Sequence, residues 1–498
     1  MPPAERFTVP MDRTDPTPAA RRPSRDGDVI RCDICVIGAG SAGLSVAAGA
    51  VQMGASVVLI EKGEMGGDCL NTGCVPSKAL IAAAHMAHAA AASPPFGIRY
   101  HAPDIRFDAV NDHVHEVIAA IAPHDSVERF EGLGVEVIRA AARFLDPRTV
   151  EAGGTRIRAR RFVVATGSRA AVPPVPGLAE SGYLTNETIF GLRQRPDHLV
   201  VMGGGPIGVE MAQAFRRLGA EVTVVEQQSI LGRDEPEAVA VVRKALLAEG
   251  ITLVEGRKVA SVRPSEGGVA VELAEGGEVI AGSHLLVATG RRPNVEGLGL
   301  EAAGIATTGK GITVDARLRT SNRSVFAIGD VCGGPQFTHV AGYQAGIVIR
   351  NALFLLPARV DYAALPRVTY TDPELAQVGL TEEEARKAGH QVEVLASPLS
   401  TNDRAQAERR TEGLVRIVLG SRGRILGATI VAPRAGEMIG TWALAIASGL
   451  KIGAMAGLVL PYPTLSEASK RAAGSHFTPR LFGRTTRAVV GFFQRFIP

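Results

Sequence analysis

The sequence predicts an α/β fold in which one strand–turn–helix–strand module occurs twice. Both copies carry the glycine pattern GxGxxG directly after an apolar strand, at residues 38–43 and 203–208. Both continue through a helix into a second strand that ends in an acid, Glu61 or Glu226. A lone GxGxxG is weak evidence, but two complete modules predict two Rossmann-like domains that each bind a dinucleotide.

The residues of each module suit the chemistry of a nucleotide. Glycine lets the backbone approach a pyrophosphate at the N-terminus of the following helix, and the terminal carboxylate accepts hydrogen bonds from a ribose diol. A later strand in each half ends in the same turn, RFVVATGSR at 161–169 and HLLVATGRR at 284–292. The internal repeat therefore extends beyond the glycine pattern itself.

The stretch GGDCLNTGCVPSK, from Gly66 to Lys78, places Cys69 and Cys74 in a glycine-rich turn just after the first module. This turn opens an Ala-rich segment that predicts a helix. A helix N-terminus lowers the pKa of a thiol, so we expect Cys74 to favour the thiolate. The two cysteines therefore indicate a redox pair.

The same motif resembles that of the class I pyridine nucleotide-disulfide oxidoreductases, which include dihydrolipoamide dehydrogenase, glutathione reductase and mercuric reductase. The resemblance covers roughly residues 30–475 of the chain. It implies that the first module binds FAD and the second NAD(P). Hydride would pass from NAD(P)H to the flavin, which then opens the Cys69–Cys74 disulfide. It also implies a homodimer, because in that family the partner subunit completes the active site.

The resemblance also places the cofactor-binding residues. The segment TSNRSVFAIGDV at 320–331 is similar to the family's second flavin motif, in which the Asp holds the ribitol. The residues expected to bind FAD are Gly38, Gly40, Ser41, Ala42, Gly43, Glu61, Lys62, Gly67, Asp68, Lys78, Ala142, Thr166, Gly167, Ser168, Asp330 and Ala341. Those expected to bind the nicotinamide cofactor are Gly203, Gly205, Pro206, Ile207, Gly208, Glu226 and Gly290.

The order of the motifs predicts a discontinuous FAD-binding domain with the nicotinamide domain inserted in it. From about residue 358 the sequence is similar to the family's α+β dimerisation domain. The expected divisions are a disordered leader at 1–28, an FAD-binding domain at 29–178 and 295–357, an NAD(P)-binding domain at 179–294, a dimerisation domain at 358–475 and a basic amphipathic extension at 476–498.

The resemblance assigns roles to the catalytic residues. Cys74 would be the thiol in charge-transfer contact with the flavin, and Cys69 the interchange thiol that meets substrate. Lys78 resembles the family lysine near flavin N5, with Glu210 as its expected partner. A cation there would stabilise the anionic reduced flavin.

One position departs from the family pattern. Disulfide reductases carry His-Pro-Thr with a Glu shortly after, whereas this chain has Tyr462 at the histidine position and Glu467 after it. A phenol with a pKa near 10 accepts a proton poorly at neutral pH compared with an imidazole near 6.5. Tyrosine at this point resembles mercuric reductases, whose thiolates bind a soft metal ion. His339, in FTHVAGYQA, is a candidate for the missing proton acceptor.

Three functions therefore stay open. The first is an FAD-dependent, NAD(P)H-linked disulfide oxidoreductase similar to dihydrolipoamide dehydrogenase. The second is mercury-type reduction of Hg(II), although the chain ends FFQRFIP without a vicinal cysteine pair and shows no N-terminal metal-binding domain. The third is NADH-linked electron transfer to a quinone or protein acceptor. The substrate would be a small disulfide, a thiol or a soft metal ion.

The choice between NAD(H) and NADP(H) depends on the charge of the residue that meets the ribose. Glu226 would repel a 2′-phosphate and bind a free 2′-hydroxyl, so NAD(H) is favoured over NADP(H), although Arg233 downstream could reach a phosphate.

Composition excludes several other classes. The 498 residues carry a net charge of only +4, so no nucleic-acid partner is expected. The five cysteines are too few for a secreted disulfide framework, and a working redox pair fits a reducing cytoplasm. Cys32 and Cys35 lie on a predicted strand, where they should face opposite sides as ordinary strand residues. The paired histidines lack a third ligand nearby, so no metal site is expected.

The extension after Arg471 contains arginines and no acid. Its apolar residues Phe482, Val489, Phe493 and Phe496 fall at helical spacing, with arginines around the other side. Such a helix could visit an anionic membrane surface, pack on its own dimer or remain loose.

Overall fold

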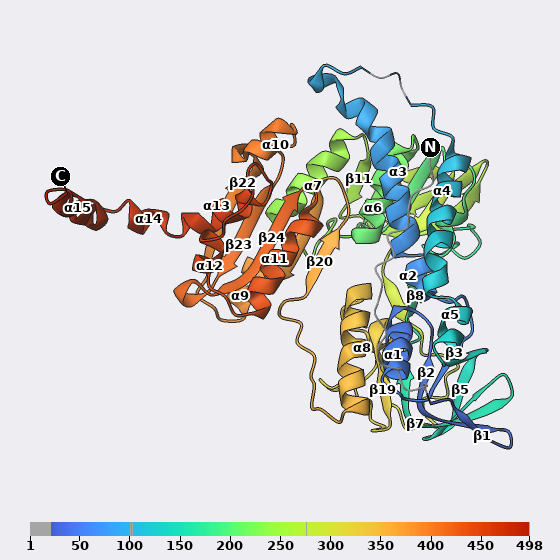
Figure 1. Cartoon of the computed structure of the whole chain (residues 1–498). Helices are drawn as coiled ribbons and strands as arrows, with labels where there is room; N and C mark the ends of the chain where they lie inside the picture. Colours follow the sequence, from blue (N-terminus) through green and yellow to red (C-terminus); the bar gives the residue numbers. More distant parts are fainter. Residues whose placement is uncertain (1–20, 100, 102, 275, 498) are drawn as a thin grey trace, which may run out of the picture. The chain divides into compact units, whose positions relative to one another are not determined.

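The computed structural model describes residues 21–99, 101, 103–274 and 276–497 (Figure 1). The chain forms two compact units, each assembled from three segments. Unit 1 comprises Met1–Asn71, Ala119–Arg169 and Arg292–Val360, and unit 2 comprises Thr72–Ile118, Ala170–Arg291 and Asp361–Pro498. The first glycine turn lies in unit 1 and the second in unit 2.

Unit 1 is built on one large sheet. Its strands are β1 (Ser24–Asp26), β2 (Val29–Ile37), β3 (Val57–Glu61), β4 (Glu136–Arg139), β5 (Ala142–Asp146), β6 (Thr149–Ala152), β7 (Thr155–Val164) and β19 (Val325–Ala327). The strand order is β4-β3-β2-β7-β6-β5, with β1 paired to β2 and β19 to β7. Strands β4, β3, β2, β7 and β19 are parallel, which is the Rossmann-like arrangement, and β5 and β6 pair antiparallel. Apolar side chains cover both faces, as a buried parallel sheet requires.

Helices α1 and α8 pack side by side on the sheet of unit 1 (Figure 1). The helices and short strands of this unit are α1 (Ser41–Gln52), α2 (Gly67–Asn71), η2 (Ala122–His124), α5 (Val127–Gly132), η4 (Gly329–Cys332), α8 (Thr338–Leu353), β17 (Thr307–Thr308) and β18 (Gly311–Ile312). Strands β8 (Ser168–Ala170) and β16 (Arg291–Pro293) fall at segment boundaries.

The leader differs from its prediction where the structure describes it. Residues 1–20 lie outside the described part of the chain. Ser24–Asp26 form β1, which pairs antiparallel with the start of β2. The folded part therefore begins before residue 29.

The expectation that Cys32 and Cys35 face opposite sides of β2 is wrong. Both are buried in the same core cluster. The reason is an irregularity between them, where the amides of Asp33 and Ile34 both donate to Ser56 O, at 3.0 and 3.1 Å. Burial raises the pKa of Cys32 to about 12 and that of Cys35 well above its usual value. They are therefore protonated core residues, consistent with an ordinary strand role.

The second module in unit 2 repeats the first in smaller form. Its strands are β9 (His198–Met202), β10 (Glu221–Glu226), β11 (Thr252–Glu255) and β15 (His284–Val287), and they form a parallel sheet in the order β11-β10-β9-β15. An antiparallel sheet is formed by β12 (Val259–Ser265), β13 (Gly268–Leu273) and β14 (Val279–Gly282). The helices and 3-10 turns of this part are α3 (Cys74–Ala92), η1 (Pro94–Phe96), α4 (Phe107–Ile121), η3 (Ile189–Gly191), α6 (Pro206–Arg217) and α7 (Pro236–Ala248). Helix α3 packs along α6 (Figure 1).

The rest of unit 2 is an α+β fold around an antiparallel sheet. Its strands are β20 (Pro366–Thr369), β21 (Glu374–Gly379), β22 (Glu393–Pro398), β23 (Leu414–Leu419) and β24 (Ile425–Ala432), in the order β20-β21-β24-β23-β22. Its helices and 3-10 turns are α9 (Glu382–Lys387), η5 (Leu399–Thr401), α10 (Asp403–Ala407), η6 (Ser421–Gly423), α11 (Ala435–Ala447), α12 (Ile452–Ala456) and α13 (Glu467–Ser475). Helices α11 and α13 cover the sheet, with Trp442 buried beneath them.

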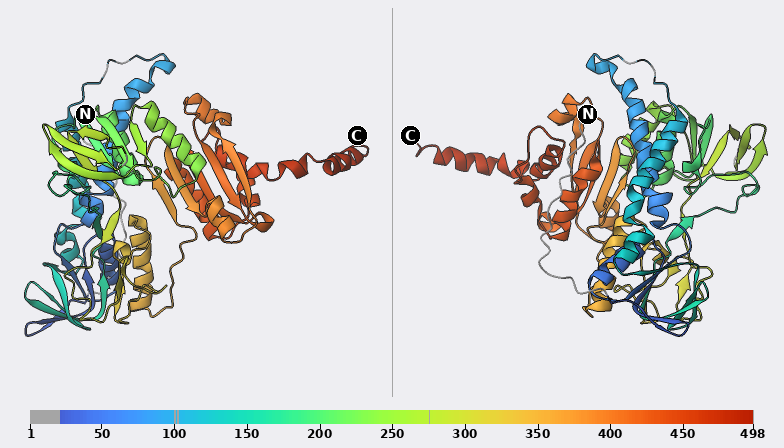
Figure 2. Two further views of the ribbon diagram at one scale, coloured as in Figure 1. Left: turned by 180° about the vertical axis from the view of Figure 1, so that it is seen from behind. Right: turned by 45° about the vertical axis from the view of Figure 1, so that its right-hand side comes forward.

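After α13 the chain continues through α14 (Thr478–Leu481) and α15 (Arg484–Phe493). These two helices extend away from the antiparallel sheet of their own unit in both views of Figure 2. Within the described residues, no helix combines the length and the apolar character needed to cross a bilayer.

Candidate functional site

The first glycine turn joins β2 to α1 and requires glycine on steric grounds. Gly38 has φ +107°, and a Cβ there would lie 2.4 Å from Ala165 O. A Cβ on Gly43 would lie 1.8 Å from Gly38 O, so the start of α1 can approach the strand only without a side chain. Helix α1 begins at Ser41, and its free amides face the turn. The geometry of this turn therefore fits a pyrophosphate, as expected from the sequence.

The acid of the first module is fixed by backbone amides. Glu61, at the end of β3, accepts hydrogen bonds from Ala39 N at 2.5 Å and Gly63 N at 2.6 Å. The carboxylate is therefore held beside the glycine turn, where a nucleotide ribose would lie.

The other residues expected around FAD occupy unit 1, except Lys78, which belongs to unit 2. Ser168 Oγ donates to Asp330 Oδ2 at 2.5 Å. This hydrogen bond joins the start of β8 to η4. Thr166 Oγ1 donates to Asn294 O at 2.7 Å. The remaining positions lie on turns, helix starts or strand ends of unit 1, namely Gly40, Ala42, Lys62, Gly67, Asp68, Ala142, Gly167 and Ala341.

The second glycine turn joins β9 to α6 by the same rules. Gly203 has φ +112°, and a Cβ there would lie 2.5 Å from Ala288 O. A Cβ on Gly208 would lie 2.0 Å from Gly203 O. A Cβ on Gly205 would meet no described heavy atom within 4 Å, so the space beside this turn is open to a ligand. Pro206 begins α6, where its missing amide costs nothing.

The carboxylate of Glu226, like that of Glu61, is held by backbone amides. It accepts from Gly204 N at 2.7 Å and from Gln228 N at 2.9 Å. Ile207 remains exposed beside the turn, and Gly290, with φ +133°, lies in the turn between β15 and β16. Both turns therefore have the geometry that a dinucleotide requires.

The two cysteines of the redox motif lie on consecutive helices, α2 and α3. Cys69 is half-buried in α2, and Thr338 Oγ1 donates a hydrogen bond to its sulfur at 3.1 Å. Thr338 is the first residue of α8, so Cys69 lies at the N-terminus of a long helix. Cys74 is exposed and is the first residue of α3. Each sulfur therefore meets a helix end that favours a thiolate.

Lys78 and Glu210 form an ion pair in unit 2. Lys78 Nζ lies 2.8 Å from Glu210 Oε2, and the Glu210 side chain is 6% exposed. The other oxygen, Glu210 Oε1, accepts from Tyr370 N at 2.9 Å. The ring of Tyr370 also stacks on the ammonium, with 4.3 Å from Lys78 Nζ to the ring centroid. The lysine is therefore oriented on two sides, one turn of α3 beyond Cys74.

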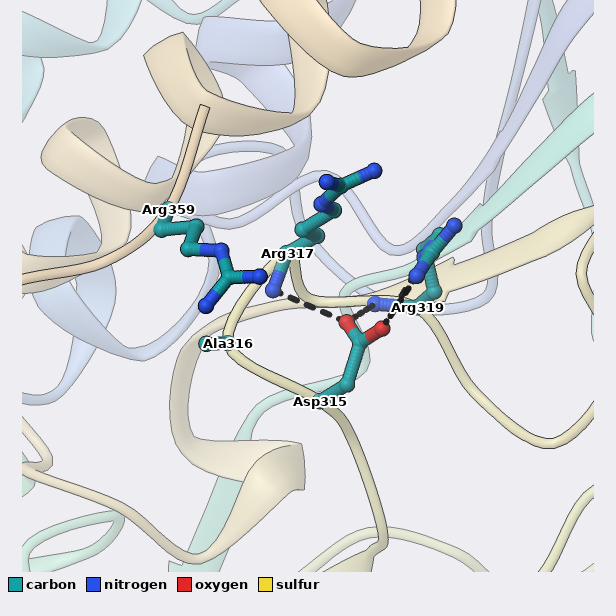
Figure 3. A pocket seen from close by; sticks show the side chains of 5 residues that line it. All are labelled: Asp315, Ala316, Arg317, Arg319 and Arg359. Atoms are coloured by element: carbon teal, nitrogen blue, oxygen red, sulfur yellow. Dashed lines mark hydrogen bonds and ion pairs between the residues drawn. The ribbon is translucent and has the colours of Figure 1, made fainter. Parts of the chain in front are cut away.

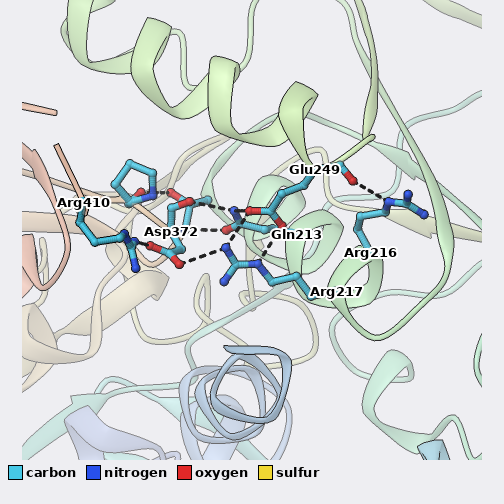
Figure 4. A network of polar contacts seen from close by, with 8 residues as sticks. Gln213, Arg216, Arg217, Glu249, Asp372 and Arg410 are labelled. Atoms are coloured by element: carbon cyan, nitrogen blue, oxygen red, sulfur yellow. Dashed lines mark hydrogen bonds and ion pairs between the residues drawn. The ribbon is translucent and has the colours of Figure 1, made fainter. Parts of the chain in front are cut away.

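A buried polar network anchors the segment that carries Tyr370 (Figure 4). Arg217, whose side chain is 3% exposed, pairs with Glu249 at 2.7 Å and with Asp372 Oδ2 at 3.0 Å. Gln213 accepts from Asp372 N at 2.7 Å and donates to Glu249 Oε1 at 2.8 Å. Arg410 also pairs with Asp372. These contacts tie α6 to residues 370–372 and so fix Tyr370 above Lys78.

Tyr462 makes a contact that the sequence did not indicate. Its hydroxyl donates to Asp403 Oδ2 at 3.0 Å, and this hydrogen bond, together with the negative charge, raises the pKa of Tyr462. Glu467 instead accepts from Thr464 N at 3.2 Å. In unit 1, His339 is exposed on α8 and stacks on Phe337 at 5.2 Å.

A cavity of about 270 Å³ lies elsewhere in unit 1 (Figure 3). It is lined by Asp315, Ala316, Arg317, Arg319 and Arg359, none of which is an expected site residue. Asp315 accepts from the guanidinium of Arg319 at 2.7 Å and from Arg317 N at 2.8 Å. Its carboxylate therefore stabilises the turn formed by residues 315–319. Over the described residues, no group of three or more His, Cys, Asp or Glu could hold a metal ion.

Sequence reasoning missed Thr338, Tyr370 and Asp403. Thr338 lies in FTHVAGYQA beside His339, and Tyr370 lies in the part similar to the family's dimerisation domain, but the contacts of both side chains depend on the folded chain. No motif in the sequence indicated Asp403 as a partner of Tyr462. It is the first residue of α10, and 59 residues separate it from Tyr462.

Comparisons with known proteins match nearly all of the described chain. A family model described as pyridine nucleotide-disulphide oxidoreductase matches residues 32–345, and the dimerisation domain of that family matches residues 365–473. The mercuric reductase of Streptomyces lividans is 38% identical over 453 residues, which cover 89% of this chain and 95% of that protein. The dihydrolipoyl dehydrogenase of Geobacillus stearothermophilus is 37% identical over 455 residues, covering 89% and 96%.

A solved structure agrees with these relatives. The Cu(II) complex of the HOCl-induced flavoprotein disulfide reductase RclA from Escherichia coli superposes with a TM-score of 0.80 at 28% identity, covering 88% of this chain and 99% of that chain. The predicted fold class, the FAD and NAD(P)H cofactors and the homodimer are confirmed by these matches. The chain belongs to the pyridine nucleotide-disulphide oxidoreductases, as a flavoprotein disulfide reductase with a redox-active pair at Cys69 and Cys74.

Proposed function

We propose that this enzyme uses its cysteine pair to reduce a soft or redox-active metal ion, and that small disulfides are slower substrates. The observation that carries the proposal is the environment of Tyr462. Its hydroxyl donates to Asp403, and its pKa is raised, so the phenol stays protonated at neutral pH. Dithiol–disulfide exchange needs a proton acceptor, whereas thiolates bind a soft metal ion without one.

Two of the similar proteins support this choice. The relative in Streptomyces lividans is named a mercuric reductase, and the RclA structure is a Cu(II) complex. The dihydrolipoyl dehydrogenases are similarly close in sequence, so a disulfide substrate is the competing assignment.

The reaction balances with two electrons. When bound, NADH would supply two electrons that FAD passes to the Cys69–Cys74 disulfide, with release of NAD⁺ and a proton. The two electrons then reduce one Hg(II) to Hg(0), or two Cu(II) to two Cu(I). The thiolates hold the metal ion and are returned to the disulfide.

The residues around the cysteines would serve this chemistry by holding charge. The N-terminus of α3 and the ammonium of Lys78 favour the thiolate of Cys74. Glu210 and Tyr370 keep that ammonium in one orientation. Thr338 donates to the sulfur of Cys69 and would stabilise its thiolate in turn. We assign Cys74 as the flavin-side thiol and Cys69 as the thiol that meets substrate.

We propose NADH rather than NADPH as the reductant. Both oxygens of Glu226 accept backbone amides, which fixes a negative charge at the end of β10. A 2′-phosphate at this place would be repelled, and a 2′-hydroxyl would donate to the carboxylate.

The setting of the enzyme is also a proposal. The predicted domains stay a proposal, with FAD at 29–178 and 295–357, NAD(P) at 179–294 and dimerisation at 358–475. The start of the first domain moves back to β1, and the two compact units divide the chain at other positions, including Asn71 and Ile118. We propose a reducing cytoplasm, no nucleic-acid partner, and contact with a membrane surface through residues 476–498.

The test compares acceptors on one preparation of the homodimer. NADH oxidation is followed with Hg(II) in excess thiol, Cu(II), lipoamide, oxidised glutathione and a quinone. We expect a metal ion to be turned over about tenfold faster than lipoamide, because a missing general base costs about 10²–10⁴-fold in proton transfer. Faster turnover of lipoamide would overturn the metal assignment. A quinone that is fastest even in Cys74→Ser would favour simple electron transfer.

The variant Tyr462→His sharpens this test. An imidazole with a pKa near 6.5 would restore a proton acceptor. Lipoamide turnover should then rise as pH increases through about 6.5, since the neutral imidazole is the base. Metal turnover should not change. Tyr462→Phe is the control, and an equal gain in that variant would contradict the role given to the phenol.

A further inference from the structure

The last residues of the described chain expose an apolar surface. We define the C-terminal arm as residues 478–497, which contain α14 and α15. Eight large apolar side chains of the arm are 48–72% exposed. They are Leu481, Phe482, Val489, Val490, Phe492, Phe493, Phe496 and Ile497. So dense a cluster of exposed apolar residues usually marks a binding surface.

The folded core of unit 2 ends immediately before the arm. Phe477 packs against the core of the antiparallel sheet. His476 Nδ1 lies 3.0 Å from Glu393 Oε1, which holds the chain end of α13 against β22. In α15, by contrast, none of the residues from Arg484 to Phe493 is buried. The arm is thus tethered firmly at one end and extends from there (Figure 2).

Helix α15 is amphipathic, and its large apolar residues begin at Val489. At 100° per residue, Val489, Val490, Phe492 and Phe493 fall on one half of the helix. Phe496 continues that half, and its ring lies 5.2 Å from the ring of Phe492. The opposite half carries Arg484, Arg487 and Arg495.

The charge of the arm has one sign. Between Arg471 and Pro498 the sequence contains five arginines and neither Asp nor Glu. The whole chain carries a net charge of only +4, so this positive charge is concentrated in the arm. A partner that binds the apolar half of α15 must therefore combine an apolar interior with negative charge at its surface.

The stability of α15 also calls for such a partner. A helix of 10 residues is marginal in water, and most helices owe their stability to packing of an apolar face. Here the described residues supply no such packing. The helix is too short to span a bilayer, but an amphipathic helix of this kind lies in the plane of the interface.

We propose that the C-terminal arm docks the reductase on a membrane surface rich in anionic lipids. The phenylalanines of α15 enter the boundary of the acyl chains, and Arg484, Arg487 and Arg495 pair with the headgroup phosphates. The homodimer carries two arms, which would raise the avidity of docking. The proposal is independent of the redox reaction, because it uses no residue assigned to the cysteine or nucleotide sites.

The test is co-sedimentation of the full-length holoenzyme with vesicles. One set contains phosphatidylcholine, and the other contains phosphatidylcholine with about a third phosphatidylglycerol, at low and at high salt. We expect binding to the anionic vesicles that weakens with salt. Arg484→Gln with Arg487→Gln should weaken it about 30-fold, from about fivefold for each charge at the surface. Phe492→Ser with Phe493→Ser should weaken binding to a similar extent.

The matched control removes two exposed arginines of unit 1, Arg148→Gln with Arg323→Gln, and should bind like the parent. NADH turnover with a soluble acceptor should be equal in all variants, so failure of docking is separable from failure of the proposed reaction. Equal binding to neutral vesicles, equal loss in the control or no sedimentation would overturn the proposal. Conversion of the Phe492 and Phe493 variant to monomers in gel filtration would overturn it in favour of a subunit interface.

Discussion

The two glycine turns hold their acids in the same way but differ in what lies over the turn. In unit 1, Gly66 N donates to Ala39 O at 2.9 Å, and a Cβ on Gly67 would lie 2.8 Å from Gly40 Cα. The redox motif thus covers the first turn. In unit 2, a Cβ on Gly205 meets no described atom within 4 Å, and Ile207 is 39% exposed.

This difference teaches how one repeated module can serve two kinds of cofactor. We therefore expect a ligand at the covered turn to leave slowly and to stay bound as a prosthetic group. A ligand at an open turn can exchange at every catalytic cycle. FAD and the nicotinamide cofactor require this division, because the flavin cycles in place and NADH must be replaced.

The largest effect should come from filling the contact inside the first turn. Gly43→Ala places a methyl 1.8 Å from Gly38 O, and backbone cannot yield as a side chain can. Overpacking of this kind costs about 3 kcal/mol or more, so bound flavin should fall about 100-fold. The ratio of flavin absorbance to protein absorbance measures it. Gly346→Ala, on α8 where the methyl meets no described atom within 4 Å, is the control, and flavin retained in Gly43→Ala would contradict the fit of this turn to a pyrophosphate.

The next effect should come from disturbing the contact between Gly67 of the redox motif and Gly40 of the first glycine turn. Gly67 and Gly27 share a φ of +59°, so alanine strains the backbone equally at both. The methyl of Gly27→Ala meets no described atom within 4 Å, whereas that of Gly67→Ala meets Gly40. The contact should cost about 1.5 kcal/mol more, which predicts about tenfold faster flavin release in Gly67→Ala. Release is followed by fluorescence after dilution. Equal rates in the two variants would show that the cover does not retain the flavin.

A similar change at the open turn should leave the flavin in place. Gly205→Ala fills the space beside α6 without touching the protein. We expect an unchanged Tm and flavin content, with the KM for NADH raised about tenfold by loss of uniform binding. Gly440→Ala, another position where the methyl meets no described atom within 4 Å, serves as control. Loss of flavin in Gly205→Ala would break the distinction between the turns.

The smallest effect should separate the two acids. Glu226→Gln removes the charge at the open turn, and the ratio of kcat/KM for NADPH to that for NADH should rise about fivefold as repulsion of the 2′-phosphate is relieved. Glu61→Gln should leave that ratio unchanged and weaken flavin binding instead. Steady-state kinetics with both reductants decide the matter, and a changed ratio in Glu61→Gln would show that the modules are assigned in the wrong order.

The sequence predicted those parts of the site that depend on local backbone. Gly38 and Gly43 had to be glycine because strand and helix approach each other there, and the spacing to Glu61 expresses the same geometry. The partnership of Lys78 with Glu210 came from family resemblance, since 132 residues separate the two. The ring of Tyr370 over Lys78 could not be predicted, because it depends on the buried Arg217 network.

Irregular backbone limited the prediction in another place. Strict alternation put Cys32 and Cys35 on opposite faces of β2, and one shared carbonyl, Ser56 O, brings them to the same core. Periodicity in a strand holds only while the hydrogen-bond ladder is regular.

The most direct test of the central claim counts thiols in the peptide from Gly66 to Lys78. The oxidised holoenzyme is alkylated under denaturing conditions, once before and once after addition of one equivalent of NADH in the absence of oxygen. The mass of the peptide is then measured by mass spectrometry. We expect Cys69 and Cys74 to be unmodified and linked before NADH and both alkylated after it, while Cys32 and Cys35 are alkylated throughout. Two alkylated cysteines in this peptide before NADH is added would contradict it.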